Sequence, residues 1–201
     1  MFRLERPNMA VNDPRVSGGT PPVIRRFRMW NTWDIGANED RQHIVDWVAT
    51  VARGAEGGKL KNLVLSGHGL PGFLQVGQGF NRAHLDLFKR WRGLVEKIWL
   101  PNCLVARLPD AAMQAQLNRD YPGWGTSDGN MFCSALAKNI NGYVVAATEL
   151  QCETLADYPV DMMSSFEGLV LSYGPEGAVT WSARNPSTWT TPGGACVPVP
   201  N

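Results

Sequence analysis

Long apolar runs are missing from this chain, and with them the signature of a membrane protein. The longest runs, such as Tyr143 to Ala147, are far too short to cross a bilayer. The first residues, MFRLERPNMAVNDPRV, contain no apolar core of a secretory signal peptide. We therefore expect a cytoplasmic protein, although a secretion route that needs no such signal stays open.

The chain also lacks a charge excess of either sign. It carries 19 basic and 18 acidic residues among 201, and its longest basic run is Arg25-Arg26. Proteins that bind nucleic acid or anionic membranes usually show a basic patch or stripe. Neither partner is therefore predicted, and the oligomeric state cannot be read from the sequence.

Metal-ligand spacing is the third absence. The four cysteines are Cys103, Cys133, Cys152 and Cys196; no two form a C-x-x-C pair, and no histidine lies near them in sequence. This spacing argues against a zinc site. Four scattered cysteines in a chain of this length also make a poor disulfide framework. We expect reduced thiols, no metal and no cofactor.

The pattern of apolar residues predicts an α/β domain over residues 23–201, preceded by a flexible arm over 1–22 that is rich in Pro, Gly, Asn and Arg. Strands and helices alternate, which indicates a three-layer domain with a mostly parallel sheet and a C-terminal β-hairpin. The expected strands are 23–30, 61–66, 96–103 and 143–148, and the expected hairpin is 169–173 with 178–182. Helices are expected after a cap at Asp40, over 82–91, over 111–118, and through Asn139 after a cap at Asp128 or Asn130.

Two of these strands end on residues that can do chemistry. Leu63-Val64-Leu65-Ser66-Gly67 leads to His68, and Ile98-Trp99-Leu100-Pro101-Asn102 leads to Cys103. Parallel strands place their carboxyl ends at one edge of a sheet, where α/β proteins bind ligands. A thiol nucleophile and an imidazole base at this edge predict a Cys103/His68 dyad. The alternatives are a buried cysteine that only packs and a histidine that only serves a turn.

Two further motifs fail in their sequence context. Residues 67–72 match G-x-G-x-x-G, but the stretch after Gly72 is short and β-like, whereas a dinucleotide site needs a helix there. Residues 125–129 match G-x-S-x-G, but Tyr121-Pro122-Gly123 before them cannot form the strand that a nucleophile elbow requires. The second motif is better interpreted as a turn that leads into the cap of a helix.

The segments around His68 and Cys103 resemble the caspase-like clan of cysteine peptidases, which includes caspases, metacaspases, gingipains and CHAT-type domains. The clan has an apolar strand ending in His-Gly and a later apolar strand ending in the nucleophilic Cys. Residues 129–137 and 142–148 are similar to its next helix and strand, and the chain is especially similar to bacterial caspase-like domains. It departs from the clan pattern at Asn102 and Leu104, beside the Cys.

The resemblance implies a cysteine endopeptidase that acts on protein or peptide substrates. Cys103 would be the nucleophile, His68 the base and acid, and the backbone N–H groups of Gly69 and Cys103 would hold the oxyanion. Arg107 would suit an acidic substrate side chain, and Asp128 or Glu149 a basic one. Two alternatives remain: a non-catalytic relative that serves as a binding or scaffold module, and another thiol-dependent acyl-transfer enzyme.

Overall fold

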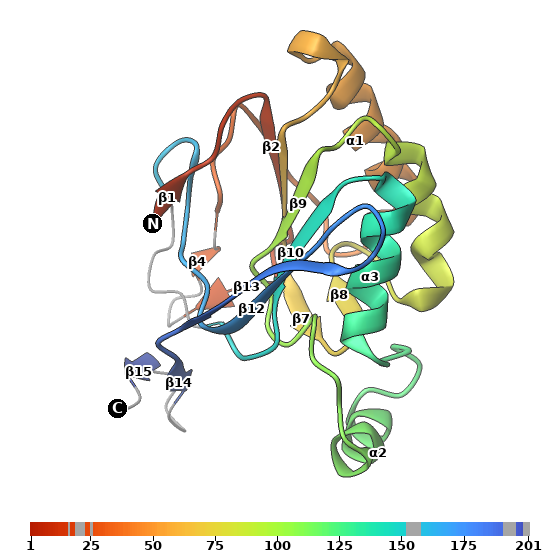
Figure 1. The fold of residues 1–201 in the computed structure, drawn as a ribbon, viewed down its shortest axis with the longest axis vertical. Helices are drawn as coiled ribbons and strands as arrows, with labels where there is room; N and C mark the ends of the chain where they lie inside the picture. The colour runs from red at the N-terminus through yellow and green to blue at the C-terminus, as the bar shows by residue number, and fades with distance from the viewer. Residues whose placement is uncertain (16, 19–22, 25, 152–157, 191–195, 199–201) are drawn as a thin grey trace.

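The computed structural model describes residues 1–15, 17–18, 23–24, 26–151, 158–190 and 196–198. At the centre is a seven-stranded mixed sheet with the strand order β13-β12-β10-β9-β6-β2-β5 (Figure 1). These strands are β2 (Asn8–Asn12), β5 (Asn31–Asp34), β6 (Asn62–Ser66), β9 (Lys97–Leu100), β10 (Tyr143–Ala147), β12 (Gly168–Tyr173) and β13 (Val179–Asn185).

Shorter elements complete the chain. Four antiparallel pairs lie outside the main sheet: β1 (Phe2–Arg3) with β11 (Met162–Met163), β3 (Ser17–Gly18) with β4 (Val23–Ile24), β7 (His68–Leu70) with β8 (Phe73–Gln75), and β14 (Thr188–Thr190) with β15 (Cys196–Pro198). The α-helices are α1 (Arg41–Gly54), α2 (Ala111–Asp120) and α3 (Gly129–Ile140), and the 3-10 helices are η1 (Glu56–Gly58) and η2 (Arg82–Trp91).

The five strands from β5 to β10 run parallel; β12 pairs antiparallel with β10, and β13 pairs antiparallel with β12. The chain pairs β2 first with β5 on one side and then with β6 on the other. The direction in which strands are added thus reverses at β2. In open α/β sheets such a reversal opens a crevice at the carboxyl ends of the strands, and here that edge follows β2 and β6.

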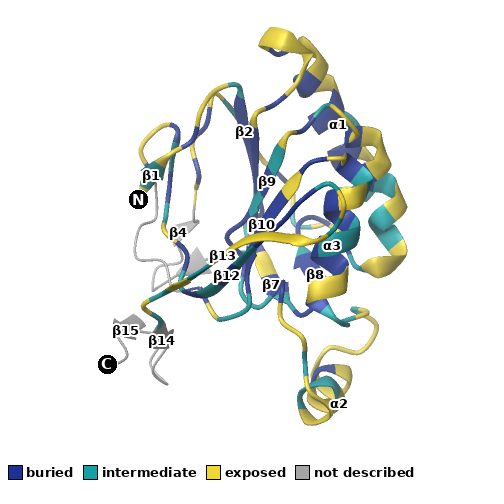
Figure 2. Cartoon of the chain, viewed as in Figure 1, coloured by how far each residue is buried: buried dark blue, intermediate teal, exposed yellow. Residues whose placement is uncertain are grey.

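The helical face of the sheet carries the larger core. Alternate residues of each strand point to it, such as Met9 and Val11 from β2 and Leu63 and Leu65 from β6. Side chains of α1, η2 and α3 cover them: Ile44, Val48, Phe88, Trp91, Phe132 and Leu136. Figure 2 shows these helices buried toward the sheet and exposed on the outside.

The opposite face is covered without a helix in the described part of the chain. Ala10, Val64 and Val145 point to this side, where Phe27 and Tyr158 stack with ring centroids 4.6 Å apart. The cover consists of extended segments around residues 26–30 and 158–166, together with β1 and β11. The expected three-layer arrangement is therefore wrong here: the sheet is mixed and mostly parallel as predicted, but described helices pack on one face only.

The N-terminal prediction also needs correction. Residues 1–22 were expected to form a flexible arm, yet β2 lies inside the sheet between β5 and β6, and all five of its residues are buried. Its polar ends are satisfied by distant groups: the Asn8 side chain donates to the Leu4 carbonyl at 3.0 Å, and Asn12 donates to the Phe27 carbonyl at 3.1 Å. The domain therefore includes residues before 23.

The strand expected over 23–30 is replaced by β4 and β5. Phe27 is buried, but its backbone N–H donates to the Asn12 side chain instead of joining a strand ladder. The other expected strands, the three α-helices and the C-terminal hairpin are confirmed within a few residues. The Arg82 helix is present as a 3-10 helix.

Candidate functional site

The strands that lead to His68 and Cys103 are neighbours, as predicted. β6 and β9 pair in parallel, with Leu63 opposite Ile98 and Val64 opposite Trp99. His68 begins the short strand β7 and is exposed, whereas Cys103 lies on a turn after β9 and is half-buried. Both residues therefore follow adjacent strands at the carboxyl edge of the sheet.

Close contacts lock the two strand ends together. The buried Asn102 amide donates a hydrogen bond to the Gly67 carbonyl oxygen at 2.6 Å. Gly69 packs against the Cys103 carbonyl, and a Cβ at position 69 would lie 2.6 Å from Val105 Cγ2 and 2.9 Å from Asn102 Cβ. No side chain fits there, so glycine at position 69 allows the histidine turn and the cysteine turn to touch.

Leu104 gives the cysteine turn its shape. Its φ of 62° lies in the left-handed region, which a bulky non-glycine residue seldom adopts. The Leu104 N–H donates to the Glu149 carbonyl at 3.1 Å, which ties the turn to the segment after β10. Strained backbone of this kind clusters at functional sites, where a sharp turn presents a side chain at the sheet edge.

The sulfur of Cys103 is held by the backbone of Gln151. The Gln151 N–H donates to Sγ at 3.3 Å, and the thiol donates to the Gln151 carbonyl at 3.7 Å. Gln151 is itself anchored, because its amide donates to the Glu167 carbonyl at 3.1 Å and accepts from the Glu167 N–H at 2.9 Å. An N–H donor directed at sulfur stabilises the thiolate form.

The ring of His68 is oriented by the backbone of Arg15, since Nε2 lies 3.0 Å from the Arg15 carbonyl oxygen. A carbonyl oxygen can only accept, so Nε2 carries the hydrogen in this bond. In the neutral imidazole the lone pair is then on Nδ1, which makes Nδ1 the basic atom.

Arg15 is placed by the carboxyl end of β2. Asp13 is fully buried, and its carboxylate accepts from the Arg15 N–H at 2.9 Å and from the Gly77 N–H at 2.8 Å. The Asp13 N–H in turn donates to the Ser66 carbonyl at 2.9 Å. Three strand ends therefore meet at the site, those of β2, β6 and β9.

Sequence reasoning missed Asp13, Arg15 and Gln151. Asp13 and Arg15 fall in the segment interpreted as a flexible arm. Gln151 contacts Cys103 through backbone atoms, which every residue type has, so the sequence could not point to it. The one available clue was the acidic residue directly after the short apolar run Met9-Ala10-Val11.

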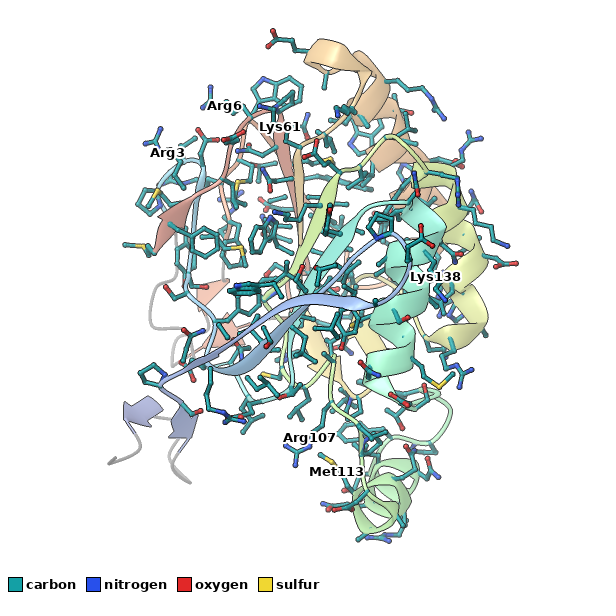
Figure 3. All side chains as sticks on the ribbon, in the orientation of Figure 1. Arg3, Arg6, Lys61, Arg107, Met113 and Lys138 are labelled. Atoms are coloured by element: carbon teal, nitrogen blue, oxygen red, sulfur yellow. The ribbon has the colours of Figure 1, made fainter. Side chains whose placement is uncertain are left out.

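The three residues proposed for substrate binding have other contacts here. Asp128 caps α3, accepting from the Met131 N–H at 3.0 Å. Glu149 accepts from the Ser187 hydroxyl at 2.8 Å and from Arg184 at 3.0 Å, and these bonds lower its pKa. Arg107 is exposed on the segment leading to α2 and projects outward (Figure 3).

The two motifs that failed in sequence context fail in the structure as well. Residues 68–75 form the β7–β8 hairpin where a dinucleotide site needs a helix. Ser127 precedes the α3 cap and follows no strand. Cys133 is fully buried in α3, and burial raises the pKa of its thiol. Cys152 lies outside the described residues.

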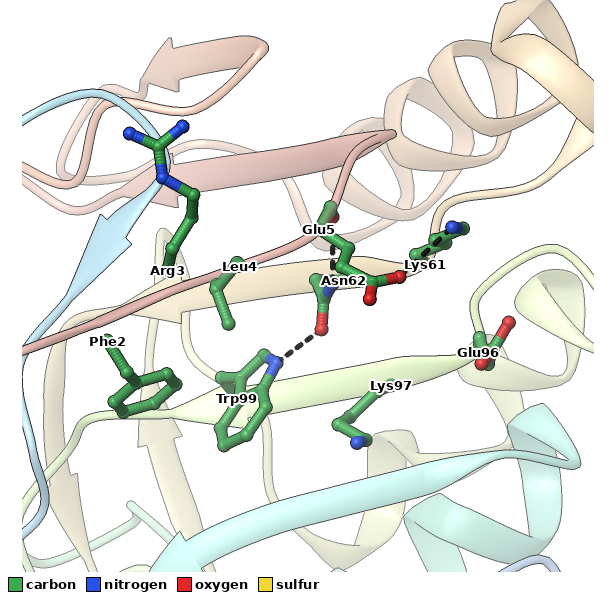
Figure 4. Close-up of a pocket in the computed structure, with 9 residues that line it drawn as sticks. All are labelled: Phe2, Arg3, Leu4, Glu5, Lys61, Asn62, Glu96, Lys97 and Trp99. Atoms are coloured by element: carbon green, nitrogen blue, oxygen red, sulfur yellow. Dashed lines mark hydrogen bonds and ion pairs between the residues drawn. The ribbon is translucent and has the colours of Figure 1, made fainter.

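A cavity of about 290 Å³ opens at the opposite edge of the sheet, near the start of β6 and β9 (Figure 4). There the Trp99 indole donates to the Asn62 side chain at 2.7 Å, and Lys61 pairs with Glu5 at 3.0 Å. Among the described residues, its lining contains no cysteine, serine, threonine or histidine. This cavity is therefore separate from the Cys103 and His68 edge.

Within the described residues, no three His, Cys, Asp or Glu side chains gather as a metal site, and no helix has the length and apolar character needed to cross a membrane. Comparisons with protein-family models, with curated proteins and with solved structures find no match to this chain.

Proposed function

We propose that this protein is a cysteine peptidase related to the caspase-like clan, with Cys103 as nucleophile and His68 as base. The observation that carries the proposal is the hydrogen bond from His68 Nε2 to the Arg15 carbonyl, next to a cysteine turn that touches the histidine turn. A base needs an orienting partner as well as a nearby nucleophile, and the Arg15 carbonyl supplies that orientation.

In the proposed reaction His68 Nδ1 takes the thiol proton, and Cys103 Sγ attacks the carbonyl carbon of the scissile peptide bond. The tetrahedral oxyanion accepts hydrogen bonds from the backbone N–H groups of Gly69 and Cys103. His68 then protonates the leaving amine, and a thioester remains on Cys103. Water, deprotonated by His68, hydrolyses the thioester and restores the thiol.

Several features support this proposal over a non-catalytic scaffold. The thiol is half-buried at a sheet edge, whereas Cys133 is sealed in the core. The backbone at Leu104 is strained directly beside the nucleophile. A protein or peptide is the proposed substrate. The cytoplasm is the proposed location because four scattered cysteines suit reduced thiols better than a disulfide framework.

The test is cleavage of a mixed peptide library by wild type and three variants. Cys103→Ala should abolish cleavage, and His68→Ala should reduce it by about 100-fold or more. Cys133→Ala, the matched control, should keep the rate within a few-fold and at most lower stability. Equal cleavage by wild type and Cys103→Ala would refute the mechanism.

Thiol alkylation separates the scaffold alternative from the peptidase. In a Cys152→Ser, Cys196→Ser background, native Cys103 should react with iodoacetamide much faster than the same thiol in denatured protein. No cleavage together with ordinary reactivity would favour the non-catalytic relative.

A further inference from the structure

Next to His68 the structure contains a second cavity, of about 390 Å³. It is lined by Arg15, Arg41, Phe73, Gln75, His84 and Trp124, among others. Gln75 is the β8 partner of His68, and Arg15 is the residue whose carbonyl orients the His68 ring. Two residues that line the cavity, Arg15 and Gln75, therefore also contact or pair with His68, the proposed base.

We infer that this cavity binds a carboxylate group. Its lining, as far as the described residues go, contains two arginines and no carboxylate. Arg15 is paired with the buried Asp13, which offsets its charge. Arg41 has no ion pair in the described part of the chain, and its guanidinium donates to the backbone carbonyls of Gln78 and Gly79. The cavity thus retains the positive charge of Arg41.

Neutral donors add to this charge. The Nδ1 atom of His84 accepts from the Asn81 N–H at 3.2 Å, so in the neutral ring Nε2 carries the hydrogen and can donate. Burial and the nearby Arg41 charge lower the pKa of His84, which favours that neutral ring. A carboxylate accepts hydrogen bonds from both kinds of donor, charged and neutral.

The apolar wall indicates how the carboxylate is carried. Phe73 and Trp124 lie with ring centroids 4.9 Å apart and both line the cavity. They suit the short methylene stem of an aspartate or glutamate side chain in a peptide, or that of a small free dicarboxylate. The peptide source rests on the proposed function, because such a side chain would enter beside His68 while the scissile bond lies at Cys103.

The test is calorimetric binding to full-length Cys103→Ala protein, which separates affinity from turnover. The probes are blocked pentapeptides with Asp or Glu at the central position, the matched Asn and Gln peptides, and succinate. We expect the acidic peptides to bind about 10-fold or more tightly than the amide peptides, as an unpaired cavity charge requires. Equal affinity for acidic and amide peptides would overturn the inference.

Three variants locate the site, and each lowers the net charge by one. Asn38→Asp adds a carboxylate at the rim without removing a contact, because Asn38 lines the cavity and its side chain makes no hydrogen bond among the described residues. Arg41→Gln removes the unpaired charge. Both should weaken binding of acidic peptides about 10-fold, whereas Arg53→Gln, exposed near the end of α1, should leave it unchanged.

Asn38→Asp keeps the test valid if Arg41→Gln fails to fold. Tighter binding of succinate than of any acidic peptide would identify a free dicarboxylate as the ligand and still support a carboxylate site. Selective binding of acidic peptides without cleavage by wild type would support this site and refute the peptidase. Cleavage of acidic and amide peptides at equal rates would support the peptidase and refute the carboxylate site.

Discussion

The Asn102 amide donates a hydrogen bond of 2.6 Å to the Gly67 carbonyl oxygen, across the ends of β9 and β6. Each residue directly precedes a proposed catalytic residue, Cys103 and His68. The bond is buried, so if the Asn102 amide is removed, water cannot take its place on the Gly67 carbonyl. One side chain thus holds together the two turns that carry the dyad.

Asn102→Ala should therefore lower the free energy of unfolding by about 1–3 kcal/mol and reduce peptide cleavage. Urea unfolding and the cleavage rate check the two effects. Asn118→Ala, at an exposed position on α2, is the matched control and should change stability by less than about 0.5 kcal/mol. Similar losses in both variants would argue against a special role for Asn102.

Gly69→Ala should separate the histidine and cysteine turns. The added Cβ would press on the Cys103 carbonyl and on Val105 and Asn102, and none of the three is a flexible chain end. We expect a loss of about 1–3 kcal/mol in stability, typical of overpacking, together with reduced cleavage. Gly54→Ala is the control, since a Cβ there meets nothing within 4 Å. An unchanged melting temperature in Gly69→Ala would contradict the contact.

Met9→Ala tests whether β2 belongs to the core. Met9 is fully buried, so truncation should cost about 2–5 kcal/mol of unfolding free energy. Met131→Ala, where the side chain is 50% exposed, should cost far less. A loss no larger than that of Met131→Ala would restore the flexible-arm interpretation. Chemical denaturation of both variants gives the comparison.

Glu149 predicts a pH dependence. Hydrogen bonds from the Ser187 hydroxyl, the Leu169 N–H and Arg184 lower its pKa below the ordinary value of 4.5 in the folded state. A depressed carboxyl pKa stabilises the fold above 4.5, and this contribution is lost as pH falls through the folded pKa. Glu149→Gln should thus be less stable than wild type at pH 7, with the difference shrinking toward pH 3.

The exposed Glu176→Gln is the control for this titration, and it should match wild type at both pH values. Melting temperatures measured from pH 3 to pH 7 give the profile. A stability difference for Glu149→Gln that stays constant with pH would show that its charged form is not what stabilises the fold.

Tyr173→Phe should be neutral or stabilising by about 1 kcal/mol. The Tyr173 hydroxyl is buried and has no hydrogen-bond partner among the described residues, so its removal relieves a desolvation cost. Trp91→Phe gives the contrast: the buried indole N–H donates to the Val45 carbonyl at 2.8 Å, and its loss should destabilise the protein by about 1–3 kcal/mol. Differential scanning calorimetry measures both, and destabilisation by Tyr173→Phe would reveal a partner for the hydroxyl.

Sequence patterning located the strands whose apolar runs lie between a predicted helix and a turn. Leu63 to Leu65 and Ile98 to Leu100 fall in this class, which is why the neighbouring placement of His68 and Cys103 could be predicted. β2 was missed although its apolar run, Met9-Ala10-Val11, is as long as these two, because the Pro, Asn and Asp residues around it are typical of a loop. Those asparagines are buried through bonds to Leu4 and Phe27, contacts that no local pattern encodes.

The site was predictable only as far as side-chain chemistry goes. The thiol and the imidazole can be identified from the sequence because only Cys and His carry them. The groups that hold them are the backbone carbonyl of Arg15 and the backbone of Gln151. Any residue could supply these atoms, so their positions depend on tertiary structure alone. The same holds for the charge at Arg41, because only the folded structure shows that none of the described carboxylates pairs with it.

The position of β2 also bears on how the sheet can form during synthesis. The ribosome makes β2 first among the seven strands; β5 then joins one of its sides and β6 the other, and β9, β10, β12 and β13 follow in order outward from β6. Each new strand therefore docks on an open border of what already exists, and none has to insert between two paired strands. A nascent chain can build this sheet in the order of translation.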